Sequence, residues 1–309
     1  MPDETTRVEL LRGLAVLAEP PGAEHDELIA ALALGSAPSP AEYSDVFLFQ
    51  LYPYASVYLG GEGMMGGDAA DRIAGFWRAL GLEPPSEPDH LAALVGLYAT
   101  LAEGESTLEG AERVLSRRSR AALLHEHLTP WIFAYLDRMM EIGPPTYRRW
   151  AELLCHVLRE SVTALASSMP SELPAHLRHA LPLADPREID PEDFLSGLLA
   201  PARTGMIVTR WDLARVAAEA DIGLRAGERR YALEHLLAQR ADAVLHLLAA
   251  EGRRQEAAHR RRAEWLGAAA AWLADRAGAT AALLEALAHD GALGGKAGAA
   301  AGGANASRG

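Results

Sequence analysis

Apolar residues recur at the spacing of an α-helix along almost the whole chain, and prolines separate one such segment from the next. In residues 7–18, for example, Val8, Leu11 and Leu14 lie on one face of a helix. Alanine, the strongest helix former, makes up roughly a fifth of the residues, and β-branched residues are few. Only residues 55–59 and 206–209 resemble strands. We therefore predict an all-α protein of the helix-bundle type.

A proline-rich stretch divides the expected helices into two groups. Residues 170–193 contain Pro170, Pro174, Pro182, Pro186 and Pro191, a density that is typical of a linker or hinge. The length of 309 residues also fits about two structural units. We expect an N-terminal helical core over residues 1–169, a hinge over 170–193, and a C-terminal helical subdomain with an extension over 194–290. Residues 291–309, rich in glycine and alanine, are expected to form a disordered tail.

Acidic residues outnumber basic ones, and the excess lies in the N-terminal third of the chain. The chain has 42 acidic and 29 basic residues, a net charge of −13. Residues 1–110 hold 18 acidic and 4 basic residues, whereas residues 111–309 hold 24 acidic and 25 basic ones. A general nucleic-acid binder needs a basic face, so this balance argues against a nucleic-acid partner.

The first residues show no pattern of a secretory signal, and the sequence shows no run that predicts a membrane span. The chain begins Met1-Pro2-Asp3-Glu4, whereas a secretory signal begins with positive charge followed by an apolar run. No uncharged apolar run reaches the ~18 residues that a membrane span needs. The single cysteine, Cys155, excludes an internal disulfide and a cysteine-cluster metal site. We expect a cytoplasmic protein without membrane insertion.

Residues 61–66 match the pattern G-x-G-x-x-G of dinucleotide-binding loops. In such proteins the loop follows a strand of a parallel sheet, and a second strand ends in an acidic residue about 20 residues later. Here residues 68–81 instead run into a proline turn. We interpret the segment as a glycine loop leading to a helix that Asp68 caps. Nucleotide binding is the alternative interpretation.

The histidines and the cysteine form no pattern typical of a metal or catalytic site. His125 and His127 stand two residues apart, so on a helix they would point about 200° away from each other. His176 and His179 would share a face, but they lie in the proline-rich stretch without a nearby pair of carboxylates. Catalytic patterns such as H-E-x-x-H and G-x-S-x-G are absent from the sequence. We predict no metal, no cofactor and no enzymatic activity, with a metal site as the alternative.

Two short patterns indicate where helices begin. Thr209 and Asp212 have the spacing of a capping box and predict a helix over residues 210–220. Ser86 and Asp89 have the same spacing ahead of the most apolar helical segment, which starts at His90. Capping explains Asp89, but it explains neither Glu87 nor His90. The segment Glu87-Pro88-Asp89-His90 is therefore the candidate functional site.

Several segments, in this order, resemble the TorD/DmsD/NarJ family of chaperones. The segment YPYASVYLGGEGMM (52–65) is followed by a helix with Phe76 and Trp77, and Glu87-Pro88-Asp89-His90 stands in the positions of the E-P-x-D-H-type motif of the family. Residues 127–131 are similar to the family's H-L-x-P-W segment, and residues 199–217 to the later part of longer members. The resemblance covers roughly residues 41–250. The chain departs from the family in lacking a glutamate soon after the motif histidine and in having an alanine-rich C-terminal extension.

The resemblance implies a TorD-like, all-helical cytoplasmic chaperone for a molybdenum-cofactor oxidoreductase. Members of the family bind the N-terminal twin-arginine leader peptide of the catalytic subunit until cofactor insertion is complete. NarJ-like members instead bind the N-terminus of a cytoplasmic-facing catalytic subunit. The motif aspartate and histidine and nearby aromatic residues are implicated in peptide binding in the family. This implies peptide binding by Asp89 and His90, with Tyr58, Phe76 and Trp77 as further candidates.

Physical chemistry supports the same site for such a peptide. A peptide with two arginines followed by an apolar stretch needs a site that places acidic side chains beside an apolar groove. Glu87 and Asp89 would supply charge-assisted hydrogen bonds to guanidinium groups, and Phe76 and Trp77 would supply apolar area. The acidic N-terminal third would attract the peptide. The alternative is a helical adaptor, not an enzyme, that binds the folded surface of a partner.

Overall fold

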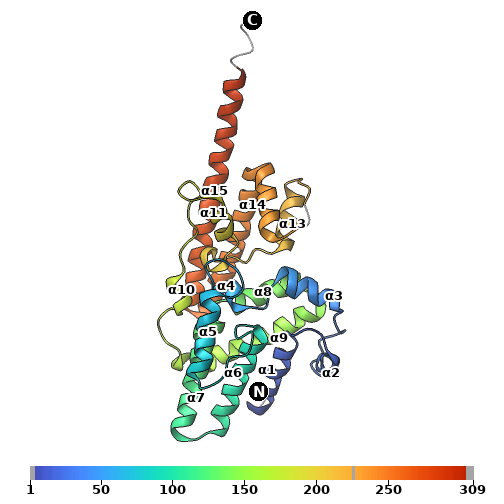
Figure 1. Ribbon diagram of the computed structural model, residues 1–309, viewed down its shortest axis with the longest axis vertical. Coiled ribbons are helices and arrows are strands. Elements are labelled where there is room, and N and C mark those ends of the chain that lie inside the picture. The colour runs from blue at the N-terminus through green and yellow to red at the C-terminus, as the bar shows by residue number, and fades with distance from the viewer. Residues whose placement is uncertain (1–3, 225–226, 304–309) are drawn as a thin grey trace.

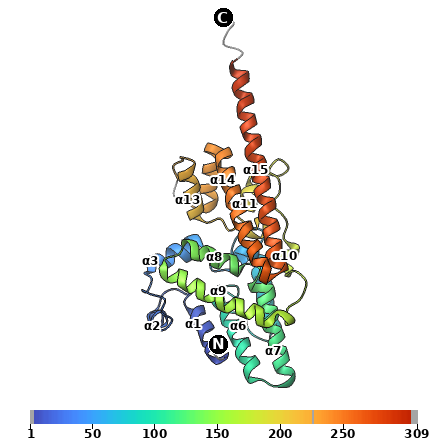
Figure 2. The same ribbon diagram turned by 180° about the vertical axis from the view of Figure 1, so that it is seen from behind.

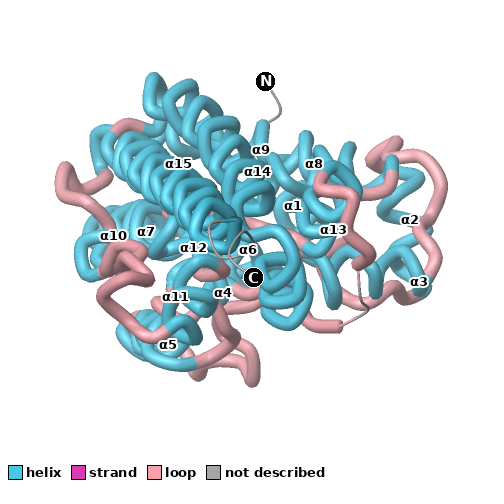
Figure 3. The backbone as a smooth tube through the Cα atoms, turned by 90° about the horizontal axis from the view of Figure 1, so that it is seen from above, coloured by secondary structure: helices cyan, strands magenta, loops and turns pink. Residues whose placement is uncertain are grey.

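The computed structural model describes residues 4–224 and 227–303, and over these residues it contains helices and no strand (Figures 1 and 3). The prediction of an all-α fold is therefore confirmed. The α-helices are α1 (Glu4–Val16), α2 (Ala23–Ala31), α3 (Pro40–Tyr43), α4 (Ala55–Leu59), α5 (Gly67–Ala79), α6 (Leu91–Thr107), α7 (Gly110–Ala122), α8 (Ile132–Ile142), α9 (Pro145–Leu165), α10 (Ala175–His179), α11 (Pro191–Leu198), α12 (Pro201–Thr204), α13 (Arg210–Glu219), α14 (Arg229–Leu266) and α15 (Ala268–Gly303). Two π-helical segments, η1 (Ser44–Gln50) and η2 (Leu123–Leu128), and a short 3₁₀ turn, η3 (Ala166–Ser168), complete the order.

The larger apolar core lies among the N-terminal helices. Helix α1 packs against α6 and α9, and α9 packs against α8 (Figure 2). Trp131 and Trp150 are among the largest fully or almost fully buried side chains, and the Trp150 Nε1 donates a hydrogen bond to the Leu14 carbonyl oxygen at 2.9 Å. Because this bond joins α9 to α1, it holds the N-terminal helix against the core.

A second apolar core lies among α11, α13, α14 and α15. Helices α14 and α15 run side by side, and the C-terminal part of α15 extends beyond the rest of the molecule (Figures 1 and 2). Gly205 lies where α12 meets α15, with φ +69, and a Cβ there would be 2.5 Å from the Leu273 carbonyl oxygen. Both the backbone conformation and the close approach therefore require glycine.

A buried ion pair joins the two groups of helices. The Arg138 guanidinium on α8 donates to both carboxylate oxygens of Asp212 on α13, at 2.6 and 2.7 Å. Arg138 NH1 also lies 3.5 Å from Glu251 on α14. The predicted capping box is confirmed, because Thr209 and Asp212 bond to each other's side chains and backbone at the start of α13. Asp212 thus serves both the local cap and the long-range pair.

Three local predictions are wrong. Residues 55–59 form helix α4 and not a strand, because the backbone amide of Ser56 finds its acceptor in Asp89. Residues 206–209 are extended but pair with no strand in the part of the chain that the structure describes. Helix α5 begins at Gly67 after Gly66 as its N-cap, so Asp68 lies in the first turn and does not cap it.

The proline-rich stretch 170–193 lies against the helices around it. It contains α10, whose Leu177 is 1% exposed and packs beside Leu273 of α15. Its role as a hinge between two domains stays a prediction. The tail expected over residues 291–309 coincides with the end of α15 and with residues 304–309, which lie outside the described residues, so its disorder also stays a prediction.

Candidate functional site

Residues 87–90 form the turn that leads into α6. His90 is the N-cap of this helix, and its Nδ1 accepts a hydrogen bond from the Ala92 backbone amide at 3.2 Å. The expected capping box of Ser86 and Asp89 is therefore wrong, because His90 takes the capping position. The Ala55 amide donates to the Asp89 carbonyl oxygen at 2.9 Å, which joins the turn to the start of α4.

Asp89 points into the molecule. It is 5% exposed, and its Oδ2 accepts a hydrogen bond from the Ser56 amide at 3.0 Å. Ser56 in turn accepts a hydrogen bond on its Oγ from the Gly66 amide at 3.0 Å. Because the free amides at a helix start need acceptors, Asp89 supplies the missing cap of α4 and, through Ser56, holds the glycine loop.

Glu87 lies on the surface, in a turn that hydrogen bonds hold from two sides. Its Oε1 accepts a hydrogen bond from the Tyr54 hydroxyl at 2.9 Å. Burial, followed by this bond and the charge of Glu87, raises the pKa of Tyr54. The Trp77 Nε1 on α5 donates to the Pro88 carbonyl oxygen at 3.2 Å, so the turn is held against α5 as well.

His90 is buried and lies among three carboxylates. Its ring meets the Tyr54 ring edge-on, with centroids 5.0 Å apart. Burial lowers the pKa of His90, and the charges of Glu19, Glu87 and Asp89 oppose this shift. The hydrogen bond from the Ala92 amide requires a His90 Nδ1 that carries no proton, and the lowered pKa favours this form.

A groove of about 580 Å³ opens between the end of α1 and the start of α6. Glu19 and Glu87 stand on its rim, and the side chain of Glu19 is 50% exposed with its Oε1 3.6 Å from His90 Nδ1. Neither carboxylate pairs with an arginine within residues 4–224 and 227–303. Small side chains form much of the rest of the lining, and the complete lining is Arg12, Ala15, Val16, Glu19, Pro85, Ser86, Glu87, His90, Ala92, Ala93 and Gly96. The groove thus combines free negative charge with room for a main chain.

Sequence reasoning missed Glu19 altogether. It lies just beyond α1, far from the Glu87 turn in the sequence, and only the packing of α1 on α6 brings the two carboxylates to one groove. The one sequence signal was the excess of acidic residues in the N-terminal third. Arg12, the basic residue of the groove, is already paired with Glu103 at 2.6 Å and Glu9 at 2.8 Å.

The aromatic candidates lie away from this groove. Tyr58 is 5% exposed, its ring stacks on Trp131 at 5.1 Å, and its hydroxyl donates to the Tyr52 carbonyl oxygen. Phe76 is half-buried against the ring of His127, with centroids 5.0 Å apart. Trp77 is half-buried behind the turn. The structure therefore brings Glu87, Asp89, His90 and Trp77 together, while Tyr58 and Phe76 pack elsewhere.

The glycine loop has a different setting from that of a dinucleotide-binding loop. The part of the chain that the structure describes has no parallel sheet, and residues 62–65 border a separate cavity of about 490 Å³ beside Leu199 and Arg229. Met64 and Met65 are 63% and 59% exposed there. The described residues also hold no cluster of three or more metal-ligating side chains placed to bind an ion.

Residues 17–136, which include the groove residues Glu19 and Glu87, match the nitrate reductase delta subunit family. The match runs from the end of α1 into α8 and includes Glu19, the glycine loop and the Glu87 turn, so the resemblance to the family of NarJ is confirmed over this segment. No curated protein matches the chain.

The matched family comprises chaperone-type maturation factors that act on the catalytic subunits of molybdoenzymes. Among the described helices, none is both long enough and apolar enough to span a bilayer.

Proposed function

We propose that the protein is a cytoplasmic chaperone that binds the N-terminal twin-arginine leader peptide of a molybdenum-cofactor oxidoreductase subunit until cofactor insertion. The observation that carries this proposal is the groove between α1 and α6, with Glu19 and Glu87 on its rim and neither of them paired with an arginine in the described residues. A carboxylate and a guanidinium form two parallel hydrogen bonds, so two carboxylates suit two arginines. The small side chains of Ala92, Ala93 and Gly96 let the peptide backbone approach α6 closely.

The remaining site residues act mainly by holding the groove in shape. Asp89 and His90 cap α4 and α6, and thereby fix the direction of the turn that presents Glu87. Trp77 supports the same turn from α5. Tyr58 and Phe76 contribute through the core contacts that they make with Trp131 and His127 rather than through contact with peptide.

Titration of the full-length chain with synthetic leader peptides tests the proposal. A twin-arginine peptide is expected to bind, and replacement of both arginines by glutamine should weaken binding. Glu19→Gln and Glu87→Gln should each weaken binding about fivefold, the magnitude of one partly exposed charge pair. Glu83→Gln is the control, because Glu83 is exposed in the same turn region but does not line the groove. Affinity should also fall as salt increases.

Equal affinity for the arginine and glutamine peptides, or equal losses in Glu83→Gln and Glu87→Gln, would contradict the proposal. The alternative of an adaptor for a folded partner is favoured by one observation, the exposed patch of Leu48, Phe49 and Trp211 on η1 and α13. Phe49→Ser with Trp211→Ser should abolish partner capture if the protein is an adaptor. The same double variant should leave leader binding unchanged if it is a leader-binding chaperone.

A further inference from the structure

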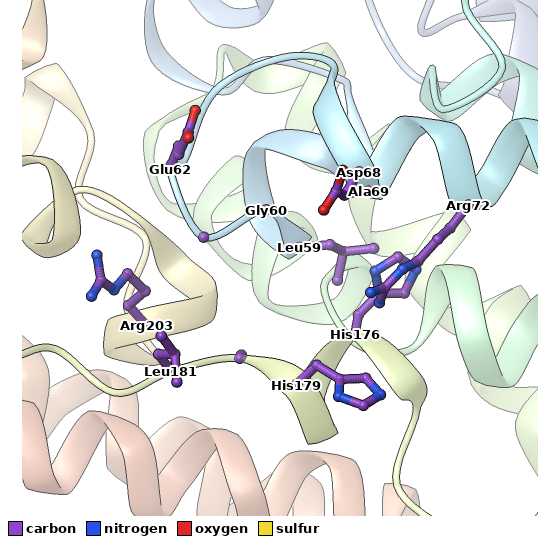
Figure 4. Close-up of a pocket in the computed structure, with 12 residues that line it drawn as sticks. Leu59, Gly60, Glu62, Asp68, Ala69, Arg72, His176, His179, Leu181 and Arg203 are labelled. Carbon is purple, nitrogen blue, oxygen red and sulfur yellow. The ribbon is translucent and has the colours of Figure 1, made fainter.

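Two methionines stand exposed on the glycine loop that joins α4 to α5. The loop runs from Gly60 past Glu62 to Asp68, at the start of α5 (Figure 4). Met64 and Met65 are 63% and 59% exposed, although their side chains are large and apolar. Single exposed apolar residues are normal on a protein surface, but an adjacent pair beside a cavity indicates a binding surface.

The course of this loop is fixed on both sides of the methionines. Gly63 has φ +64, which glycine adopts without strain, and a Cβ there would lie 2.9 Å from the Leu199 carbonyl oxygen and the Ala200 Cα. Because both atoms belong to the backbone between α11 and α12, they cannot move aside. Beyond the methionines, the Gly66 amide donates to the Ser56 Oγ at 3.0 Å. The exposure of the two methionines therefore follows from how the loop is held.

The cavity of about 490 Å³ beside the methionines lies between this loop and the start of α14. Tyr52, Val57 and Leu199 line it together with the two methionines. Its charged lining residues are two arginines and two glutamates, namely Arg229, Arg230, Glu62 and Glu228. Arg230 is already paired with Glu192 at 3.2 Å. Because the charges at the cavity balance, its apolar side chains decide what it accepts.

This cavity and the groove between α1 and α6 are close to each other. Ser56, which holds the loop through its Oγ, also donates its amide to Asp89 in the Glu87 turn at 3.0 Å. Tyr52 of the cavity stands two residues before Tyr54, whose hydroxyl donates to Glu87 at 2.9 Å. Two residues of chain span at most about 7 Å, so one extended peptide can reach both places.

We propose that the cavity beside the two methionines binds the apolar stretch that follows the arginines of the leader peptide. This role rests on the function proposed above and adds the second part of its binding site. The groove itself is lined largely by small and charged side chains, and Phe76 packs against His127 instead of lining it. Methionine side chains are unbranched and adapt to apolar partners of different shape, which suits a peptide segment. Arginines bound at Glu19 and Glu87 would direct the apolar stretch toward the two methionines.

Titration calorimetry of the full-length chain with three synthetic peptides tests this role. The peptides are the leader, the leader with both arginines replaced by glutamine, and the leader with its apolar stretch replaced by serines. The double variant Met64→Ser with Met65→Ser should bind the leader about tenfold more weakly than the wild type, because apolar area is no longer buried. It should bind the serine peptide as the wild type does, because that peptide has no apolar side chains to lose.

Two further variants control this comparison. Met64→Leu with Met65→Leu keeps the apolar area and should bind the leader within about threefold of the wild type. Leu115→Ser should not change leader binding, because Leu115 is 65% exposed on α7 and lines neither the cavity nor the groove. Since both methionines are exposed, the serine variant should fold as the wild type does.

Oxidation by hydrogen peroxide reports contact with the methionines independently of affinity. Saturating leader should slow the oxidation of Met64 and Met65 at least about threefold, because a buried thioether is less accessible to the oxidant. The serine peptide should leave their oxidation unchanged, and Met169, half-buried outside the cavity, is the internal control.

Three results would overturn this role of the cavity. These are wild-type affinity of the serine double variant for the leader, equal losses of affinity for the leader and the serine peptide, and unchanged oxidation of Met64 and Met65 in the presence of leader. Failure of the proposed function has a different signature, which is equal affinity of the wild-type chain for the arginine and glutamine peptides.

Discussion

The Asp89→Ala variant tests whether Asp89 shapes the groove or contacts the peptide. The substitution leaves the Ser56 amide buried without its acceptor at 3.0 Å, which costs about 1–3 kcal/mol. Loss of an N-terminal cap typically costs about 1 kcal/mol, and both figures describe the same bond. We therefore expect the free energy of unfolding to fall by about 2 kcal/mol. The unfolding temperature should fall by about 4–8 °C.

Urea denaturation followed by circular dichroism, together with leader titration, measures both properties of the variant. Asp89→Ala should lose stability and only secondarily affinity, whereas Glu87→Gln should lose affinity at unchanged stability. Asp71→Ala is a matched control, because Asp71 is an exposed carboxylate on α5 that no ion pair or hydrogen bond holds within the described residues. Wild-type stability of Asp89→Ala together with a tenfold loss of affinity would refute the reasoning and make Asp89 a peptide contact.

Three further predictions concern the packing that holds the site in place. Arg138→Met should lower the free energy of unfolding by about 3–5 kcal/mol in urea denaturation, because Asp212 stays buried without its cation; an unchanged urea midpoint would disprove this. The His127 Nδ1 and the His176 Nε2 lie 3.4 Å apart. Burial lowers the pKa of His127 to about 3 and that of His176 to about 4. As pH falls below 6.5, these two histidines therefore take up protons in the unfolded chain before they do so in the folded chain. The stabilisation by these two neutral rings is therefore complete above pH 6.5 and is lost as pH falls toward 4. The free energy of unfolding should be lower at pH 5 than at pH 7, and this difference should be smaller in His176→Gln. Gly205→Ala should destabilise the chain in thermal unfolding, and a wild-type unfolding temperature would contradict the close approach of α12 and α15.

The groove illustrates which parts of a functional site a sequence can indicate. The Glu87 turn was found because its residues are neighbours in the chain and match a family pattern. Its second carboxylate, Glu19, was missed because nothing in the sequence relates it to Glu87 before α1 packs on α6. The ring pair of His127 and His176 was missed for the same reason, since its members come from η2 and α10.

Local spacing by itself determined the helical class of the chain and the capping box of Thr209 and Asp212, because helices and caps depend on atoms within about four residues. The tertiary structure decided the rest. It made residues 55–59 a helix by placing the Asp89 carboxylate at its start, and it gave His90 the capping position of α6. It also gave Asp212 its partner, Arg138, on a distant helix. A short apolar run is compatible with either a helix or a strand, so its form is set by acceptors and neighbours that only packing supplies.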